Sequence, residues 1–253
     1  MTGSPSVLSS VAVVLDGFPL RIDRDEVLRF QGYKRDVDVP TADVLALFGE
    51  ALALGERLVR PRVVYRAAPV DGQSEDLIEV AGERLHIPAI GRLWGSLEAV
   101  GGAVCTVGDA IETRVRALFE ERELPLAMML DSVGSAAVES LAEAANDLLC
   151  QRALEESLRV TNRISPGYAG WDTAEQRALW TLCPGEPIGV TLNDACFMTP
   201  VKSITFLVGI GSEARVDHYF TQCRRCWMRD CAYRRAPAPT ASRNPIDSSV
   251  ING

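Results

Sequence analysis

Three features are missing from this chain of 253 residues: a long apolar run, a basic N-terminal segment and an excess of positive charge. A membrane-spanning helix needs roughly 20 consecutive apolar residues, and no run reaches that length, so the sequence argues against a membrane protein. A signal peptide begins with basic residues, whereas the first ten residues, MTGSPSVLSS, contain none. We therefore expect a cytoplasmic protein.

The charge balance excludes a second class of protein. The 34 acidic residues outnumber the 26 lysines and arginines, which leaves a net charge of −8. A protein of that charge repels nucleic acid, whose phosphates attract positive surfaces, so we expect no nucleic-acid partner. Apolar residues make up 47% of the chain and charged residues 24%, as in ordinary soluble proteins that bury a substantial core.

Local patterns predict short strands followed by long helices. Asp23 and Thr41 each precede an apolar helical pattern and are good N-cap residues, and residues 41–58 form a strongly amphipathic helix. A hairpin is expected at Gly82, and an apolar strand at 99–107 leads into a helix near Asp109. Residues 128–157 read as one long helix without proline. The Pro/Ser/Ala-rich residues 236–253 are aperiodic, which is typical of disorder.

The stretch NRISPGYAGWDTAEQRALW, residues 162–180, raises the question of function. Pro166 and Gly167 impose an irregular backbone between two helices, and Arg163 and Tyr168 flank it. On the pattern alone, this is an inter-helix loop whose tyrosine packs and whose arginine pairs with a surface acid. Asp172 or Thr173 can cap the helix that follows.

Three motifs together change that interpretation. They are R-x-x-x-G-Y (163–168), E-x-x-x-x-W (175–180) and G-V-T-L-x-x-x-x-x-M-x-P (189–200). With the helix SLAEAANDLL before them, they resemble the reactivation domain of cobalamin-dependent methionine synthase, a domain that binds S-adenosylmethionine, and the resemblance covers residues 131–211. It implies an α+β fold in which a mainly antiparallel twisted sheet packs with long helices.

The resemblance also implies a ligand site. Arg163 would hold the ligand carboxylate through its planar pair of donors. Tyr168 would lie near the sulfonium, where cation–π attraction is favourable, and it is the residue we assign to methyl transfer. Glu139 or Glu143, one helical turn apart, would neutralise the ammonium, with Glu143 preferred because it falls in the matching L-A-E-A. The predicted ligand-binding residues are Glu143, Arg163, Ser165, Pro166, Gly167 and Tyr168.

One departure from the family pattern lies in this loop. The family has a Pro- and Cys-containing insert after the Gly-Tyr pair, ending in Pro-Asp. Here the sequence A-G-W-D is shorter and places Trp171 directly before Asp172. The pocket for the methyl group could therefore have a different geometry.

Seven cysteines raise the question of a metal, because cytoplasmic cysteines are more often thiols or metal ligands than disulfides. Cys223, Cys226 and Cys231 form C-x2-C-x4-C, and a C-x2-C turn suits zinc or an iron–sulfur cluster. We predict a metal clip here and favour the cluster, since reactivation requires a low-potential electron. The fourth ligand is predicted to be Cys196, with His218 and then Cys183 as alternatives. The arginines of the clip could dock an acidic flavodoxin or ferredoxin.

The sequence thus predicts a stand-alone reactivation factor with methyltransferase-type activity. It would use S-adenosylmethionine to methylate the cobalamin of a corrinoid protein, or of a methionine synthase that lacks its own reactivation domain. The chain has no D-x-H-x-x-G corrinoid-binding motif, so the cobalamin must come from the partner. The alternative is a non-catalytic scaffold stabilised by zinc or an iron–sulfur cluster. We divide the chain into an N-terminal α/β portion (1–130), a ligand-binding portion (131–220), the cysteine clip (221–235) and the disordered tail (236–253).

Overall fold

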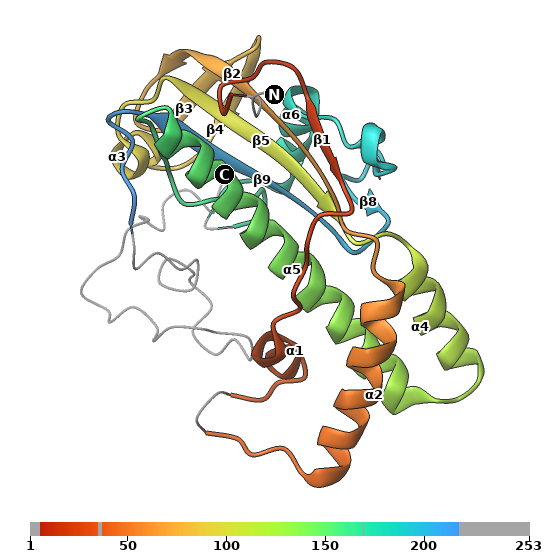
Figure 1. Ribbon diagram of the computed structural model, residues 1–253. Coiled ribbons are helices and arrows are strands. Elements are labelled where there is room, and N and C mark those ends of the chain that lie inside the picture. The colour runs from red at the N-terminus through yellow and green to blue at the C-terminus, as the bar shows by residue number, and fades with distance from the viewer. Residues whose placement is uncertain (1–5, 35–36, 169, 218–253) are drawn as a thin grey trace, which may run out of the picture.

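A computed structural model of the chain describes residues 6–34, 37–168 and 170–217. Its centre is a seven-stranded antiparallel sheet in the order β4-β3-β2-β5-β9-β6, with β1 paired to the first half of β2 (Figure 1). The strands are β1 (Val13–Asp16), β2 (Arg62–Gln73), β3 (Leu77–Val80), β4 (Glu83–His86), β5 (Ala99–Thr106), β6 (Arg159–Val160) and β9 (Ser203–Gly211). A separate small hairpin joins β7 (Thr191–Leu192) to β8 (Met198–Thr199).

Helices cover both faces of this sheet. The long helix α5 lies across one face and α6 lies on the other (Figure 1). The helices are α1 (Arg24–Phe30), α2 (Ala42–Leu58), α3 (Ile90–Trp94), α4 (Ala110–Glu120), α5 (Leu124–Glu155) and α6 (Gln176–Leu182), with single 3-10 turns η1 (Thr173–Glu175) and η2 (Glu186–Ile188). The predicted fold class, a mainly antiparallel sheet packed with long helices, is confirmed.

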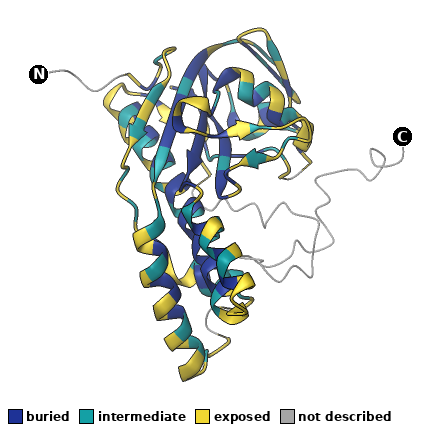
Figure 2. Ribbon diagram, turned by 90° about the vertical axis from the view of Figure 1, so that its right-hand side faces the viewer, coloured by how far each residue is buried: buried dark blue, intermediate teal, exposed yellow. Residues whose placement is uncertain are grey.

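The alternation of side chains along β5 and β9 explains how one sheet supports two cores. Every residue of β5 is buried. Along β9, Phe206 and Val208 enter the core beneath α5, whereas Leu207 between them enters the core on the α6 side. Successive side chains of a strand point to opposite faces, so two central strands without polar faces require cover on both sides. Figure 2 shows the middle of the sheet coloured largely as buried.

The N-terminal half of α5 extends beyond the sheet and packs with α1, α2 and α4 (Figure 1). Asp23 and Thr41 cap α1 and α2 as predicted, each accepting backbone N–H hydrogen bonds in the first turn. The helix expected at 128–157 begins earlier, at Leu124, because Pro125 lies in the first turn, where its missing N–H leaves no hydrogen bond unmade. Within the described residues, no helix is both long and apolar enough to cross a membrane.

Gly55 on α2 packs directly against α5. A Cβ atom at this position would lie 2.4 Å from Cγ1 of Val133. We expect Gly55→Ala to lower the free energy of unfolding by about 1–3 kcal/mol, because the two helices must separate to relieve the overlap. The matched control is Gly49→Ala on the same helix, where a Cβ meets nothing within 4 Å. That change should stabilise the protein by about 1 kcal/mol through helix propensity. Urea unfolding measures both, and equal effects would contradict the packing argument.

Candidate ligand site

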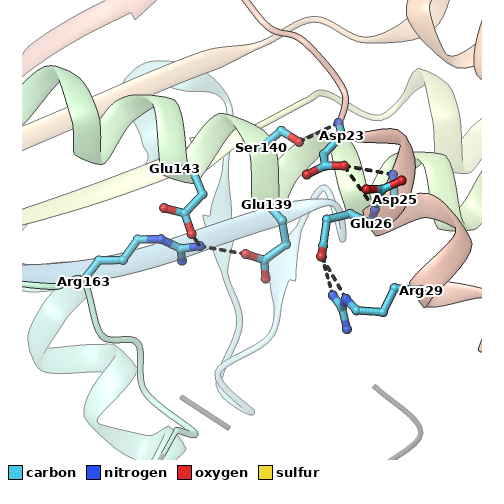
Figure 3. Close-up of polar contacts among 8 residues, drawn as sticks. All are labelled: Asp23, Asp25, Glu26, Arg29, Glu139, Ser140, Glu143 and Arg163. Carbon is cyan, nitrogen blue, oxygen red and sulfur yellow. Dashed lines mark hydrogen bonds and ion pairs between the residues drawn. The ribbon is translucent and has the colours of Figure 1, made fainter. Parts of the chain in front are cut away.

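The motif that begins at Arg163 lies along the outer edge of the sheet. After β6 the chain continues beside β9, where the backbones of Ile164 and Leu207 exchange hydrogen bonds of 3.0 and 2.8 Å. The Ile164 side chain is buried in the core on the α6 side. The Arg163 side chain instead reaches α5 on the other face (Figure 3). This extended segment therefore holds the arginine at a defined position between the sheet and α5.

Arg163 forms an ion triad with Glu139 and Glu143 of α5. Its Nη2 donates to Oε2 of Glu139 at 2.8 Å and to Oε1 of Glu143 at 2.9 Å (Figure 3). The side chains of Arg163 and Glu139 are 14% and 19% exposed, whereas that of Glu143 is 57% exposed. Burial alone would lower the pKa of the Arg163 guanidinium, but the charges of Glu143 and Glu139 and their hydrogen bonds raise that pKa above its usual value. The arginine therefore stays cationic.

The triad joins residues to which the sequence analysis gave separate roles, Arg163 for the ligand carboxylate and Glu139 or Glu143 for the ligand ammonium. The spacing of Glu139 and Glu143 correctly indicated one helical face. Their partner is Arg163, the same side chain that was predicted to hold a ligand carboxylate. A ligand carboxylate that binds this guanidinium must therefore share it with these two side chains or displace one of them.

The turn after Arg163 is closed by backbone hydrogen bonds. Gly167 donates to the carbonyl of Trp171 at 2.8 Å, and Trp171 donates to the carbonyl of Tyr168 at 2.9 Å. Gly167 has a φ of 91°, which a side-chain-bearing residue rarely adopts. Tyr168 is 41% exposed, so the predicted catalytic side chain is accessible at the surface. Pro166, between Ser165 and Gly167, is half-buried in this turn.

Ser165 anchors the turn to the sheet. Its hydroxyl donates to the backbone carbonyl of Thr205 at 2.7 Å, and its own carbonyl accepts from the N–H of Tyr168 at 3.2 Å. Thr205 in turn donates through Oγ1 to Oε1 of Gln176 at 2.8 Å. Ser165, Thr205 and Gln176 are all buried, and buried hydrogen bonds of this kind hold a backbone in one arrangement. The network ties the turn to β9 and α6.

Trp171 is the residue whose role the sequence did not reveal. Its side chain is only 3% exposed and belongs to the core on the α6 side, together with Ile164, Leu179 and Leu207. Asp172, directly after it, accepts from the N–H of Ala174 at 2.8 Å and caps η1, so of the two predicted candidates Asp172 and Thr173 the cap is Asp172. The shorter A-G-W-D sequence thus closes the turn by burying an indole. In the sequence, the only feature that could have indicated the burial of Trp171 was its position directly before a helix cap.

The other residues of the resemblance support the scaffold. Oε2 of Glu175 accepts from the backbone N–H of His86 at 3.4 Å. Nε1 of Trp180 donates to Oε1 of Glu186 at 3.0 Å. The two contacts hold α6 and its flanking turns in place.

Of the four ligands predicted for the metal clip, only Cys196 lies among the described residues. Cys223, Cys226, Cys231 and the alternative ligand His218 lie outside them. Cys196 is half-buried in the loop between β7 and β8, and the part of the chain that the structure describes contains no group of three or more potential metal ligands. The clip therefore stays a prediction.

Two other cysteines, Cys105 and Cys183, are buried. Burial raises the pKa of the Cys105 thiol far above its usual value, and burial raises the pKa of Cys183 to about 12. The Cys183 thiol donates to the carbonyl of Val64 at 3.7 Å. Cys183 therefore lies in the core as a neutral thiol, and its role as an alternative fourth ligand stays a prediction.

Comparisons with known proteins give the fold but no family assignment. No family model matches the chain, and no curated protein matches it. Among solved structures, the chain is similar to the MetH reactivation domain bound to AdoHcy, with a TM-score of 0.59 and 15% sequence identity over 87% of this chain and 83% of that one. At that identity the similarity shows a common fold, which is the fold that the sequence motifs predicted.

Proposed function

We propose that this protein binds S-adenosylmethionine at the turn of residues 163–168. Acting as a stand-alone factor, it would support reductive methylation of the cobalamin of a partner, either a corrinoid protein or a methionine synthase without its own reactivation domain. The proposal is carried by two observations: the largely buried Arg163 side chain in the segment beside β9, and Tyr168, which is 41% exposed in the turn that follows. The fold is shared with a domain whose structure contains AdoHcy.

Each predicted residue has a proposed role in binding S-adenosylmethionine. The Arg163 guanidinium binds the ligand carboxylate by charge-assisted hydrogen bonds. Glu143, which is half exposed on α5, turns from the arginine to the ligand ammonium. Tyr168 presents its ring to the sulfonium. Backbone groups of Ser165, Pro166 and Gly167 that do not close the turn meet the remaining polar atoms of the ligand.

The reaction follows from the chemistry of the two substrates. Cob(II)alamin of the partner accepts one electron from a donor such as a flavodoxin or ferredoxin, and the resulting cobalt(I) supplies an electron pair to the methyl carbon. The carbon–sulfur bond breaks, and its electron pair remains on sulfur, giving S-adenosylhomocysteine. The reduction is unfavourable alone, and the irreversible methyl transfer draws it forward. The contribution of this protein is to hold the methyl group in line with the cobalt.

Isothermal titration calorimetry with S-adenosylmethionine tests the binding step. We expect saturable binding of one ligand per chain. A second assay supplies a corrinoid protein in the cob(II)alamin state, a low-potential reductant and methyl-labelled S-adenosylmethionine, and measures label on the cobalamin. Transfer should require this protein, the reductant and the ligand together. No heat of binding at millimolar ligand would overturn the proposal and favour the non-catalytic scaffold.

A further inference from the structure

We propose that Lys202 is a positioning residue of the candidate ligand site. Its buried ammonium holds the long helix α5 at the end of the sheet, in the rotation that lets two carboxylates of α5 meet Arg163. The contacts behind this inference involve no ligand. Its consequence for S-adenosylmethionine rests on the proposed function, and it deepens that function by naming a residue outside the turn of residues 163–168 that sets the geometry there.

Lys202 lies directly before β9 and is buried, which is rare for a lysine unless the ammonium is paired. Its side chain is 10% exposed, and within the described ranges it is the only charged residue that is buried. Its Nζ forms an ion pair with Oδ1 of Asp131 at 2.7 Å and donates to Oγ of Ser135 at 2.9 Å. A buried charge is costly without such partners, so the lysine depends on these two contacts with α5.

The backbone of Lys202 is fixed to the end of the sheet. Its carbonyl accepts from the N–H of Val107 at 3.2 Å and from Oγ1 of Thr106 at 3.4 Å, where β5 ends. The side chain then crosses α5 at Gly134, where a Cβ atom would lie 3.2 Å from Cε and 3.3 Å from Cγ of the lysine. Lys202 therefore links the sheet to α5 near the point where the N-terminal half of the helix extends beyond the sheet (Figure 1).

The lysine and the arginine hold the same side of α5. Four polar residues spaced four apart form one stripe on this helix: Asp131, Ser135, Glu139 and Glu143. The first two bind Lys202, and the last two bind Arg163 (Figure 3). Rotation of α5 about its axis would break both sets of contacts. The lysine thus fixes the rotation at which the two glutamates reach the arginine.

A double-mutant cycle in the free protein tests this positioning. Asp131→Ala removes the carboxylate that holds Lys202, and Glu139→Gln weakens the ion pair with Arg163. Interactions that depend on each other give non-additive effects, so Glu139→Gln should lower the urea midpoint of unfolding in the Asp131→Ala protein by about half as much as in wild type, or less. A direct charge effect has the opposite sign, because removing Asp131 relieves repulsion of Glu139 and makes its loss more costly. Additive effects, or a larger effect, would overturn the inference.

Calorimetric titration of S-adenosylmethionine gives the second test. Lys202→Met removes the ammonium and keeps a long unbranched side chain, and it should weaken binding about tenfold, because small misplacements of a binding group are costly. Lys34→Met, which removes the only other lysine of the chain, an exposed one, is the matched control. It should bind within about twofold of wild type.

A second control separates positioning from a general loss of stability. Ile78→Val reduces the core at β3, which β2 and β5 separate from β9, and should lower the melting temperature by about 2–4 °C while affinity stays within about twofold. An equal loss of affinity in Ile78→Val and Lys202→Met would overturn the inference, as would unchanged affinity in Lys202→Met. Absence of binding by wild type would overturn the proposed function, and the cycle in the free protein would still decide whether Lys202 positions α5.

Discussion

Replacing Arg163 by alanine is expected to weaken S-adenosylmethionine binding by about thirtyfold or more. The guanidinium is held by the triad and the sheet edge before any ligand arrives, so the ligand carboxylate meets a preformed donor. Loss of a charge-assisted contact of this kind costs about 2 kcal/mol or more, and the two glutamates left behind would also repel the ligand carboxylate. Calorimetric titration of wild type and variant measures the change.

The matched control for this prediction is Arg163→Lys. Lysine keeps the positive charge near Glu139 and Glu143 but lacks the planar pair of donors. Its affinity should therefore lie between those of wild type and the alanine variant, with a melting temperature close to that of wild type. If Arg163→Ala binds the ligand within threefold of wild type, the ligand carboxylate does not bind at this arginine.

Replacing Trp171 by alanine should produce the largest loss of stability. The indole is 3% exposed in the core on the α6 side. Removing a buried tryptophan side chain leaves a cavity and costs about 3–5 kcal/mol. Because Trp171 also closes the turn that begins at Gly167, ligand binding should weaken as well. Chemical unfolding monitored by circular dichroism gives the free energy of unfolding.

Trp171→Phe separates packing from hydrogen bonding. Among the described residues, the buried Nε1 of Trp171 has no hydrogen-bond partner, so loss of the indole N–H should cost little. The phenylalanine variant should therefore retain most of the stability and the ligand affinity. A loss as large as that in Trp171→Ala would mean that the N–H makes a necessary contact, and the packing explanation would fail.

Local features of the fold were predictable because the interactions that produce them are local. The caps at Asp23, Thr41 and Asp172 each satisfy N–H groups two or three residues away, so the sequence alone indicates where those helices begin. The hairpin at Gly82 joins adjacent strands β3 and β4 and depends on the same short range. The start of α5 was misplaced at residue 128, whereas the helix begins at Leu124 with Pro125 in its first turn, a position that proline fits.

The candidate site was predictable only as a set of residue types. The motif from Arg163 to Tyr168, with acids one turn apart at Glu139 and Glu143, indicated which residues could meet a ligand. By itself, then, the sequence determined the starts of the capped helices and the hairpin, and it proposed the members of the site. Tertiary structure decided the rest. The pairing of β5 with β9 joins segments about a hundred residues apart, the triad needs that sheet to bring Arg163 to α5, and Trp171 is buried only because both faces of the sheet are covered. Contacts between distant segments depend on the whole packed chain, and no short pattern records them.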